Sequence, residues 1–385
     1  MLPFSRPSIG EEEIAEVVEC LRSGWITTGP RCERFEREFA ALCGARHAIA
    51  VSSGTAALHL ALLAVGLGAG DEAVVPALTW PATANMVVAC GAEPVFADID
   101  PRTWNLDPES LARSLTPRTK AVIPVHFAGQ PADLDAIRDV LRRAGREDIR
   151  IIEDAAHAAG AAYRGRPIGA CAANGTIAAC FSFHPIKNMT TGEGGMLATD
   201  DDELAARARL FKFHGVSRDA WRAYSGSGRP PTTYDVVLAG FKYNLTDIQA
   251  SLGIHQLAKL RRFNARRAEL ARLYLGALSD VQGLVLPREA PYPCEHAWHL
   301  FAVLLPGERP RFIERMKGLG IGTGLHFEAV HLTSFYRARG WREGALPCAE
   351  DVCSRIVSLP LYPAMNEYDL ADVAAAVREV LRDGG

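Results

Sequence analysis

The sequence has no long uninterrupted apolar run. Its most apolar stretch, residues 47–70, is broken by Ser52, Ser53, Gly54, Thr55 and His59, whereas a membrane-spanning helix needs about 20 consecutive apolar residues. The opening residues, MLPFSRPSIGEEEIAEVVE, lack the apolar core of a signal peptide and turn acidic at once. We therefore expect a cytoplasmic protein with no membrane partner.

An excess of charge of one sign is also missing. Lysine and arginine number 42 against 45 acidic residues, which gives a net charge of −3, and both signs are mixed along the chain. Proteins that bind nucleic acid usually carry a basic patch or stripe. We expect no nucleic-acid partner.

None of the nine cysteines belongs to a C-x-x-C pair, the spacing typical of redox and zinc sites. We interpret them as reduced, small apolar side chains. His296 and His299 come nearest to a metal motif, but the segment HAWHLFAVLL predicts a strand, on which residues three apart face opposite sides. We expect no metal site.

Strands and helices alternate over the first two-thirds of the chain. Apolar runs typical of strands lie at residues 47–53, 72–77, 93–99, 119–127, 149–154, 175–183 and 194–200. Helical segments separate them, for example the one that Asp107 caps and Pro108 opens. This order predicts an α/β fold with a largely parallel sheet.

The length of 385 residues suggests two domains. We expect an N-terminal arm and large domain over residues 1–250 and a smaller C-terminal domain over residues 251–385. The Gly-, Pro-, Ser- and Arg-rich stretch 217–235 predicts an exposed loop.

In parallel sheets, ligands bind beyond the carboxyl ends of the strands, and three motifs fall there. The first, SSGTAAL at residues 52–58, joins a strand to a helix. Gly54 permits a tight turn, and the first helical amides with the Ser and Thr hydroxyls can hold a phosphate. The motif also fits an ordinary Ser/Thr cap on a buried helix.

The second motif, IRIIEDAAHAAG, ends an apolar strand on Glu153 and Asp154. A desolvated carboxylate needs a cationic or hydrogen-bonding partner. A protonated ring nitrogen would satisfy Asp154, although the residue could equally cap the helix that follows.

The third motif, FSFHPIKNMTTGEGG, places Lys187 after a strand and before a glycine cluster. A lysine in a partly dry site has a lowered pKa and can form a Schiff base. An isolated lysine is usually a solvated surface residue, so the argument depends on its neighbours. A phosphate-binding turn, an acid for the ring nitrogen and a lysine for the aldehyde are together the three groups that bind pyridoxal 5′-phosphate (PLP).

The chain resembles the DegT/DnrJ/EryC1/StrS sugar aminotransferases over essentially its whole length. The resemblance rests on SSGTAAL, PALTWPATAN, PVHFAGQPADLDAI, IIEDAAHAAG, FSFHPIKNMTTGEGG and GFKYNLTDIQA. It implies the PLP-dependent aspartate-aminotransferase fold type I, with a mainly parallel seven-stranded sheet and a smaller C-terminal α+β domain. Within the family, LPFSRPSIGEEEI, SGWITTGP, HAWHLF and GIGTGLHF make the chain most similar to the UDP-4-amino-4-deoxy-L-arabinose–oxoglutarate aminotransferases.

The resemblance also implies roles for individual residues. Lys187 would carry the Schiff base, Asp154 would pair with the pyridine nitrogen and His157 would contact the ring hydroxyl. The remaining cofactor contacts would be stacking by Trp80, phosphate binding by Gly54, Thr55 and Ser182, and a phosphate contact by Asn244 from the other subunit of a homodimer. Thr27, Thr28 and His326 would lie near the sugar.

The implied reaction moves an amino group from glutamate to the C4 keto group of a nucleotide-linked keto-pentose, with pyridoxamine phosphate (PMP) as the intermediate form and 2-oxoglutarate as a product. The sequence departs from the arabinose enzymes at Gly54, at Ala57–Leu58, at Pro185 and in the stretch TTGEGG at residues 190–195. A 4-keto- or 3-keto-6-deoxyhexose therefore stays an alternative substrate. A sugar dehydrase of this fold would have histidine in place of Lys187. A non-catalytic binding protein would have lost the phosphate-binding turn, Asp154 or Lys187.

Overall fold

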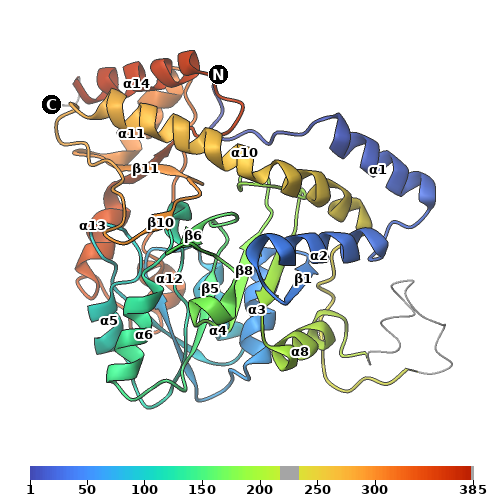
Figure 1. Ribbon diagram of the computed structural model, residues 1–385. Coiled ribbons are helices and arrows are strands. Elements are labelled where there is room, and N and C mark those ends of the chain that lie inside the picture. The colour runs from blue at the N-terminus through green and yellow to red at the C-terminus, as the bar shows by residue number, and fades with distance from the viewer. Residues whose placement is uncertain (217–233, 383–385) are drawn as a thin grey trace.

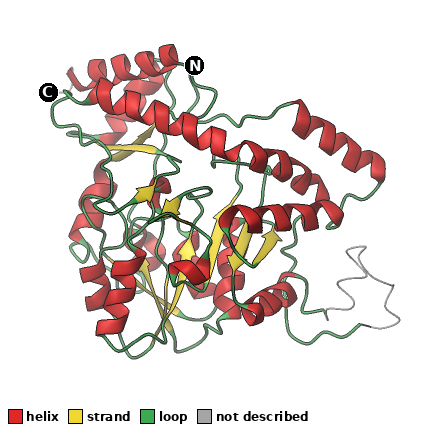
Figure 2. Cartoon of the chain, viewed as in Figure 1, coloured by secondary structure: helices red, strands yellow, loops and turns green. Residues whose placement is uncertain are grey.

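The computed structural model describes residues 1–216 and 234–382. Nearly all of the expected loop at 217–235 lies outside the described residues. Figures 1 and 2 show a central sheet with helices on both faces, and the C-terminal elements gathered at one end of it. No helix in the described part is long and apolar enough to cross a membrane.

The central sheet has seven strands in the order β1-β9-β8-β5-β4-β2-β3. Their bounds are His47–Val51, Gly195–Thr199, Ala178–Ser182, Arg150–Asp154, Thr119–Val122, Glu72–Pro76 and Glu93–Ala97 in that order. Strand β9 is antiparallel to both of its neighbours, and all the other pairs are parallel. The prediction of a mainly parallel, seven-stranded sheet is confirmed.

Alternating side chains of one strand enter different cores, because the sheet is covered on both faces. In β1, Ile49 and Val51 join the core beneath helices α3 (Gly54–Ala64) and α4 (Ala82–Ala89). Ala48 and Ala50 face the core beneath helices α2 (Pro30–Cys43) and α10 (Asp247–Leu278). The apolar runs therefore reflect burial on both sides of the sheet.

Short helices connect the parallel strands. Several of them are capped by the aspartate directly before their first residue. Helix α5 (Pro108–Ser114) begins as predicted, with the Asp107 carboxylate accepting from the amides of Glu109 and Ser110. Asp133 and Asp201 cap helices α6 (Leu134–Arg143) and α8 (Asp202–Lys212) in the same way. A small three-stranded sheet, β10 (Cys294–Glu295), β6 (Ala162–Tyr163) and β7 (Arg166–Pro167), and helix α7 (Cys171–Asn174) complete this region.

The C-terminal part forms its own core around an antiparallel pair, β11 (Phe301–Leu304) and β12 (Ile356–Leu359). Helices α11 (Arg309–Gly318), α12 (Ser334–Arg337), α13 (Pro347–Arg355) and α14 (Glu367–Arg382) belong to this part. The long helix α10 supplies Leu257 and Leu260 to the large core and Leu270 and Tyr274 to this one. The predicted domain boundary at residue 250 lies in the first turn of α10, and it stays a prediction.

The strand expected from His296 onward begins only at Phe301. Residues 296–300 form an irregular segment, in which Trp298 has a φ of +48°. Its backbone bonds the turn at Phe127–Gly129 instead of a strand, with the Ala297 amide donating to Gly129 and the His299 amide to Ala128. The strand prediction for this segment was wrong because a long-range contact decides it.

The start of β9 packs directly on the turn before α3. A Cβ on Gly195 would lie 2.5 Å from the backbone carbonyl of Ser53 and 2.6 Å from the amide nitrogen of Gly54. Only glycine allows this approach, so β9 fixes the position of the turn.

We expect Gly195→Ala to lower the free energy of unfolding by about 1–3 kcal/mol, because backbone on both sides must shift. Urea unfolding measures the change. Gly276→Ala is the control, since nothing lies within 4 Å of the added methyl group. Equal stability of both variants would contradict the packing argument.

Candidate functional site

A cavity of about 350 Å³ lies at the carboxyl ends of strands β1, β2, β4, β5 and β8. Most of the predicted site residues line it: Gly54, Thr55, Trp80, Asp154, His157, Ser182, Lys187 and His326. They come from segments far apart in the sequence, which meet because parallel strands end at one edge.

One end of the cavity is the beginning of helix α3. The Ser53 hydroxyl caps it by accepting from the amide of Ala56 at 3.0 Å. Gly54 packs against β8 so closely that a Cβ would lie 2.9 Å from Cβ of Ser182. Free amides, the Thr55 and Ser182 hydroxyls and the helix dipole together suit a phosphate group.

Asp154 stands at the last position of β5 and is 5 % exposed. Its carboxylate accepts from the Thr83 hydroxyl at 2.7 Å and from the amide of Ala156 at 3.2 Å. Burial raises the pKa of Asp154, and these two hydrogen bonds and the charge of Lys187 oppose that rise. A cation in the cavity would stabilise the carboxylate further.

The backbone of Asp154 is held by a buried histidine on the neighbouring segment. His126, whose backbone amide donates to the Asp154 carbonyl, bonds the Glu153 carboxylate at 2.8 Å. Nδ1 of His126 accepts from the amide of Ala132, so Nε2 carries the proton and donates to Glu153. Sequence reasoning missed Thr83, whose only signal was its place in the first turn of α4.

Lys187 follows a turn in which its amide donates to the His184 carbonyl at 2.9 Å. Burial lowers the pKa of Lys187 from 10.5 to about 8, although the charge of Asp154 opposes the shift. An amine with this pKa is partly neutral near physiological pH, which is the form that attacks a carbonyl or accepts a proton.

Aromatic rings form the walls of the cavity. Trp80 is 61 % exposed, and its ring lies 5.7 Å from that of Phe327. Phe327 also stacks on His157 at 5.9 Å, and Nδ1 of His326 lies 3.0 Å from the Ser358 hydroxyl. Phe327 was missed because its segment, GLHF, indicated only the neighbouring histidine.

Thr27, Thr28 and Asn244 do not line this cavity in their own chain. The Asn244 amide donates to the Thr28 hydroxyl at 2.6 Å, and Thr28 in turn donates to the Leu245 carbonyl. Asn244 also pairs with Val51, next to the turn before α3.

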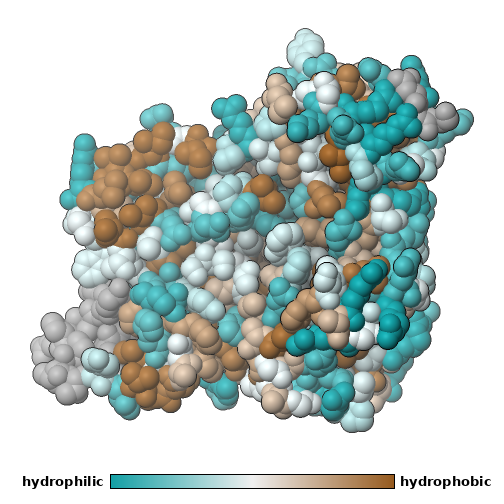
Figure 3. Space-filling model, turned by 180° about the vertical axis from the view of Figure 1, so that it is seen from behind, coloured by the Kyte–Doolittle hydropathy of each residue, from teal (hydrophilic) through white to brown (hydrophobic). Residues whose placement is uncertain are grey.

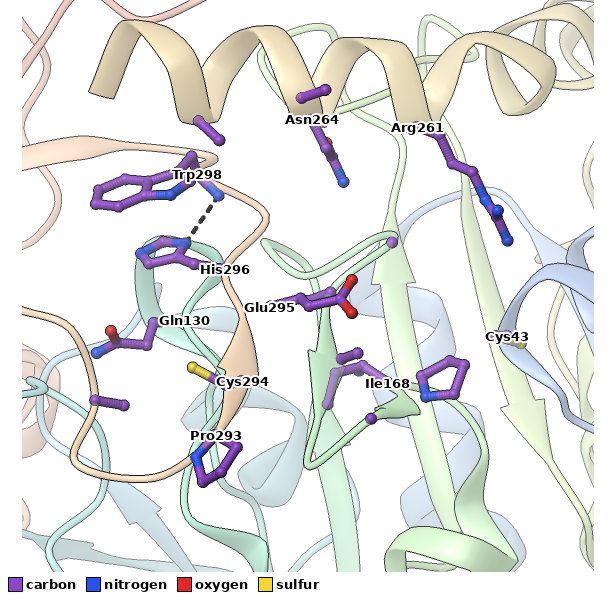
Figure 4. Close-up of a pocket in the computed structure, with 18 of the residues that line it drawn as sticks. Cys43, Gln130, Ile168, Arg261, Asn264, Pro293, Cys294, Glu295, His296 and Trp298 are labelled. Atoms are coloured by element: carbon purple, nitrogen blue, oxygen red, sulfur yellow. Dashed lines mark hydrogen bonds between the residues drawn. The ribbon is translucent and has the colours of Figure 1, made fainter. Parts of the chain in front are cut away.

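A second cavity of about 870 Å³ lies between helices α2 and α10 and the segment 289–298 (Figure 4). Arg261, Glu295, His296 and Trp298 line it, but no lysine or aspartate does. Within residues 1–216 and 234–382, no group of three or more His, Cys, Asp or Glu side chains could hold a metal ion. The smaller cavity, whose lining includes both Lys187 and Asp154, is therefore the candidate active site.

The smaller cavity fits PLP on its own features. It offers an anion-binding helix terminus, a buried carboxylate, a lysine of lowered pKa and a flat indole. Nδ1 of His157 is buried without a hydrogen-bond partner in the described structure. Fold and site together define a PLP-dependent aminotransferase of fold type I.

The chain belongs to the DegT/DnrJ/EryC1/StrS aminotransferase family, whose model matches residues 7–378. It is 39 % identical to DesV from S. venezuelae in complex with a ketimine intermediate, over 96 % of this chain and 94 % of that one, with a TM-score of 0.86. A Streptococcus pneumoniae protein assigned as a sugar aminotransferase, in its PMP form, is 30 % identical over 100 % of both chains, with a TM-score of 0.92. That protein also has a PLP-form structure.

A sugar aminotransferase from Micromonospora echinospora is 30 % identical over 98 % of this chain and 100 % of that one, with a TM-score of 0.88. These matches confirm the predicted family, fold type and cofactor.

We expect the lowered pKa of Lys187 to be visible in the stability of the cofactor-free protein. The folded state binds this proton less tightly than the unfolded state, so the group disfavours folding below about pH 8. Lys187→Met should therefore be more stable than the wild type at pH 7.5. Its advantage should shrink by about 1 kcal/mol per pH unit as the pH rises above 8.

Urea unfolding at pH 7.5, 8.5 and 9.5 tests this, with Lys317→Met on the surface of α11 as the control. A constant difference across these pH values would show that Lys187 titrates as an ordinary lysine.

Proposed function

We propose that the enzyme transfers an amino group from glutamate to the C4 keto group of a nucleotide-linked keto-pentose, carried by UDP or dTDP, in aminosugar biosynthesis. This proposal rests chiefly on one observation: Lys187 and Asp154 line the same cavity, which also contains a helix N-terminus suited to a phosphate. Relatives described as sugar aminotransferases along the whole chain support a sugar as the amino acceptor.

In this proposal each residue has one task. PLP, when bound, supplies an electron sink that weakens the bonds at the amino-acid Cα. Lys187 would hold PLP through a Schiff base in the resting enzyme. Its released Nζ would take the Cα proton of glutamate and deliver it to the cofactor, and in the second half-reaction it would carry a proton from the cofactor to the sugar carbon that receives the amino group. Asp154 would accept a hydrogen bond from the protonated pyridine nitrogen, and His157 would donate to the ring hydroxyl. Trp80 would cover the flat face of the ring, which an indole suits.

We further propose a homodimer whose subunits share their active sites. Thr27, Thr28 and Asn244 lie together outside their own chain's cavity, as expected for residues that serve the partner. Helix α1 (Glu11–Ser23) and its flanks also expose Ile14, Val18, Leu21 and Ile26. Figure 3 shows the brown apolar surface over this helix, and contiguous apolar patches commonly mark protein interfaces.

A 6-deoxyhexose with a 4-keto or 3-keto group is the second candidate substrate, because the sequence departs from the arabinose enzymes at Gly54, Ala57–Leu58 and Pro185 and in the stretch 190–195. The threonines have internal tasks, since Thr190 donates to the Phe183 carbonyl and Thr191 to that of Glu193. These two threonines therefore stabilise their own loop and do not decide between the two sugars.

The purified enzyme should be yellow and should lose its visible band when glutamate is added. Borohydride reduction should trap the cofactor on Lys187, and Lys187→Ala should lack the band. A protein without a visible band even after PLP is added would contradict the assignment and favour a binding protein. A band that persists with glutamate would favour a dehydrase.

With a panel of UDP- and dTDP-linked keto-sugars, we expect the highest kcat/KM for a 4-keto-pentose. A 6-deoxyhexose carries one more carbon, and a carbon of this kind in a fitted pocket changes kcat/KM by about 10–200-fold. A higher kcat/KM for either keto-6-deoxyhexose would transfer the assignment to the second candidate.

Mixed dimers test the shared site. Lys187→Ala removes the lysine, and Asn244→Asp places a carboxylate against the expected phosphate. If Asn244 serves the partner, a mixed dimer of the two variants has one wild-type site, so random mixing should restore about a quarter of the wild-type activity. If Asn244 serves its own chain, mixing should restore none. Each variant remixed with itself is the control.

A further inference from the structure

Two histidine rings pack against each other at the back of the cofactor cavity. The ring centroids of His157 and His299 are 4.4 Å apart and tilted by 42°. His157 is 4 % exposed and His299 is 2 % exposed. Nδ1 of His157 and both ring nitrogens of His299 are buried without a hydrogen-bond partner among the described residues.

The backbone holds His299 firmly at this place. The His299 amide donates to the Ala128 carbonyl at 2.8 Å, and Ala128 and Trp298 both adopt positive φ angles without being glycine. Gly129 has a φ of +95°, and a Cβ there would lie 2.9 Å from the His157 carbonyl and 3.1 Å from the His299 amide. A strained, close-fitting turn of this kind is typical of a position that function constrains.

Arg267 fixes the same residue from helix α10. Its guanidinium is 2 % exposed and donates from Nη1 to the His299 carbonyl at 3.2 Å and to the Leu361 carbonyl at 2.6 Å. The backbone of His299 is therefore held by hydrogen bonds from two sides, whereas its ring contacts the ring of His157.

The surroundings keep both rings neutral. Burial, followed by the neighbouring ring of His157 and the positive charges of Lys187 and Arg267, lowers the pKa of His299 well below its usual value. Burial and the same lysine lower the pKa of His157 likewise. A neutral imidazole has one donor and one acceptor nitrogen, so the open question is which nitrogen of His157 carries the proton.

We propose that His299 is a positioning residue that donates a hydrogen bond to Nδ1 of His157 and so fixes the proton of His157 on Nε2. Two of the three unpartnered nitrogens can pair when the rings turn from their tilted packing into edge-to-edge contact and their centroids move slightly apart. His157 lines the cavity, and with this tautomer it can only donate from Nε2. The role of that donor toward the cofactor's ring hydroxyl rests on the proposed function, whereas the pairing of the two histidines does not.

The tautomer of His157 can be measured in the unmodified, cofactor-free protein. With ¹⁵N-labelled histidine, two-bond ¹⁵N–¹H couplings report which ring nitrogen is protonated, and His157→Gln assigns the signal. We expect a single Nε2–H tautomer that does not titrate between pH 6 and 9. An Nδ1–H tautomer, a mixture or protonation in this range would overturn the proposal, whatever the substrate of the enzyme.

Two variants separate positioning from packing. His299→Phe keeps the ring and removes the donor, while His299→Gln keeps a donor. We expect the Phe variant to show mixed tautomers of His157 and a PLP dissociation constant about threefold to tenfold higher. The Gln variant should keep the Nε2–H tautomer. A Phe variant with the wild-type tautomer and only a lower melting temperature would show that His299 acts by packing alone.

His296 offers a matched control three residues earlier. It stacks on Trp298 at 4.0 Å, and its Nδ1 accepts from the Trp298 amide (Figure 4). Burial lowers its pKa to about 3, but it borders the other cavity. His296→Phe should leave the His157 tautomer and the PLP affinity unchanged, and a change like that of His299→Phe would overturn the specific pairing.

Discussion

The placement of Lys187 beside Asp154 in a largely dry cavity is the constraint on which the rest of the site depends. Burial acts on the two groups in the same chemical direction, toward the neutral forms: it lowers the pKa of the amine and raises that of the acid. Their mutual attraction opposes both shifts. The fold must therefore supply further hydrogen bonds to keep the acid charged, and it does so with Thr83 and the amide of Ala156. Ionisable groups whose pKa values are shifted in this way by burial and by each other are typical of functional sites.

Close backbone packing gives this arrangement its rigidity. Strand β9 enters the sheet antiparallel, and its first residue, Gly195, touches the turn at Ser53 and Gly54. Gly54 in turn packs against Ser182 at the end of β8. The end of the cavity at the start of α3 is thus fixed closely against two strands. Polar groups held on strand ends are positioned more exactly than groups on free loops.

The sequence predicted those features that depend on local chemistry. Apolar runs bounded by helices predicted the parallel strands, Asp107 predicted a helix start, and polar residues after strands predicted where Asp154 and Lys187 would meet. The features it did not predict depend on contacts between distant segments. Residues 296–300 look like a strand, but the turn at Ala128 and Gly129 takes their hydrogen bonds. Periodicity carries no information about such a contact.

The cavity also depends on the C-terminal part of the chain, which no single motif revealed. Leu325, His326 and Phe327 form one wall, and the N-terminal arm holds that wall in place. Leu2 bonds the backbone of Gly320 and Gly322, and the Phe4 ring lies 5.2 Å from that of His326. The N-terminal residues and the segment 320–327 thus meet beside one cavity. Because Arg267 of α10 bonds the carbonyls of both His299 and Leu361, a shift of the C-terminal sheet would move the histidine behind the cofactor cavity. Arg267 therefore links the position of the C-terminal part to that of His299 behind the cavity.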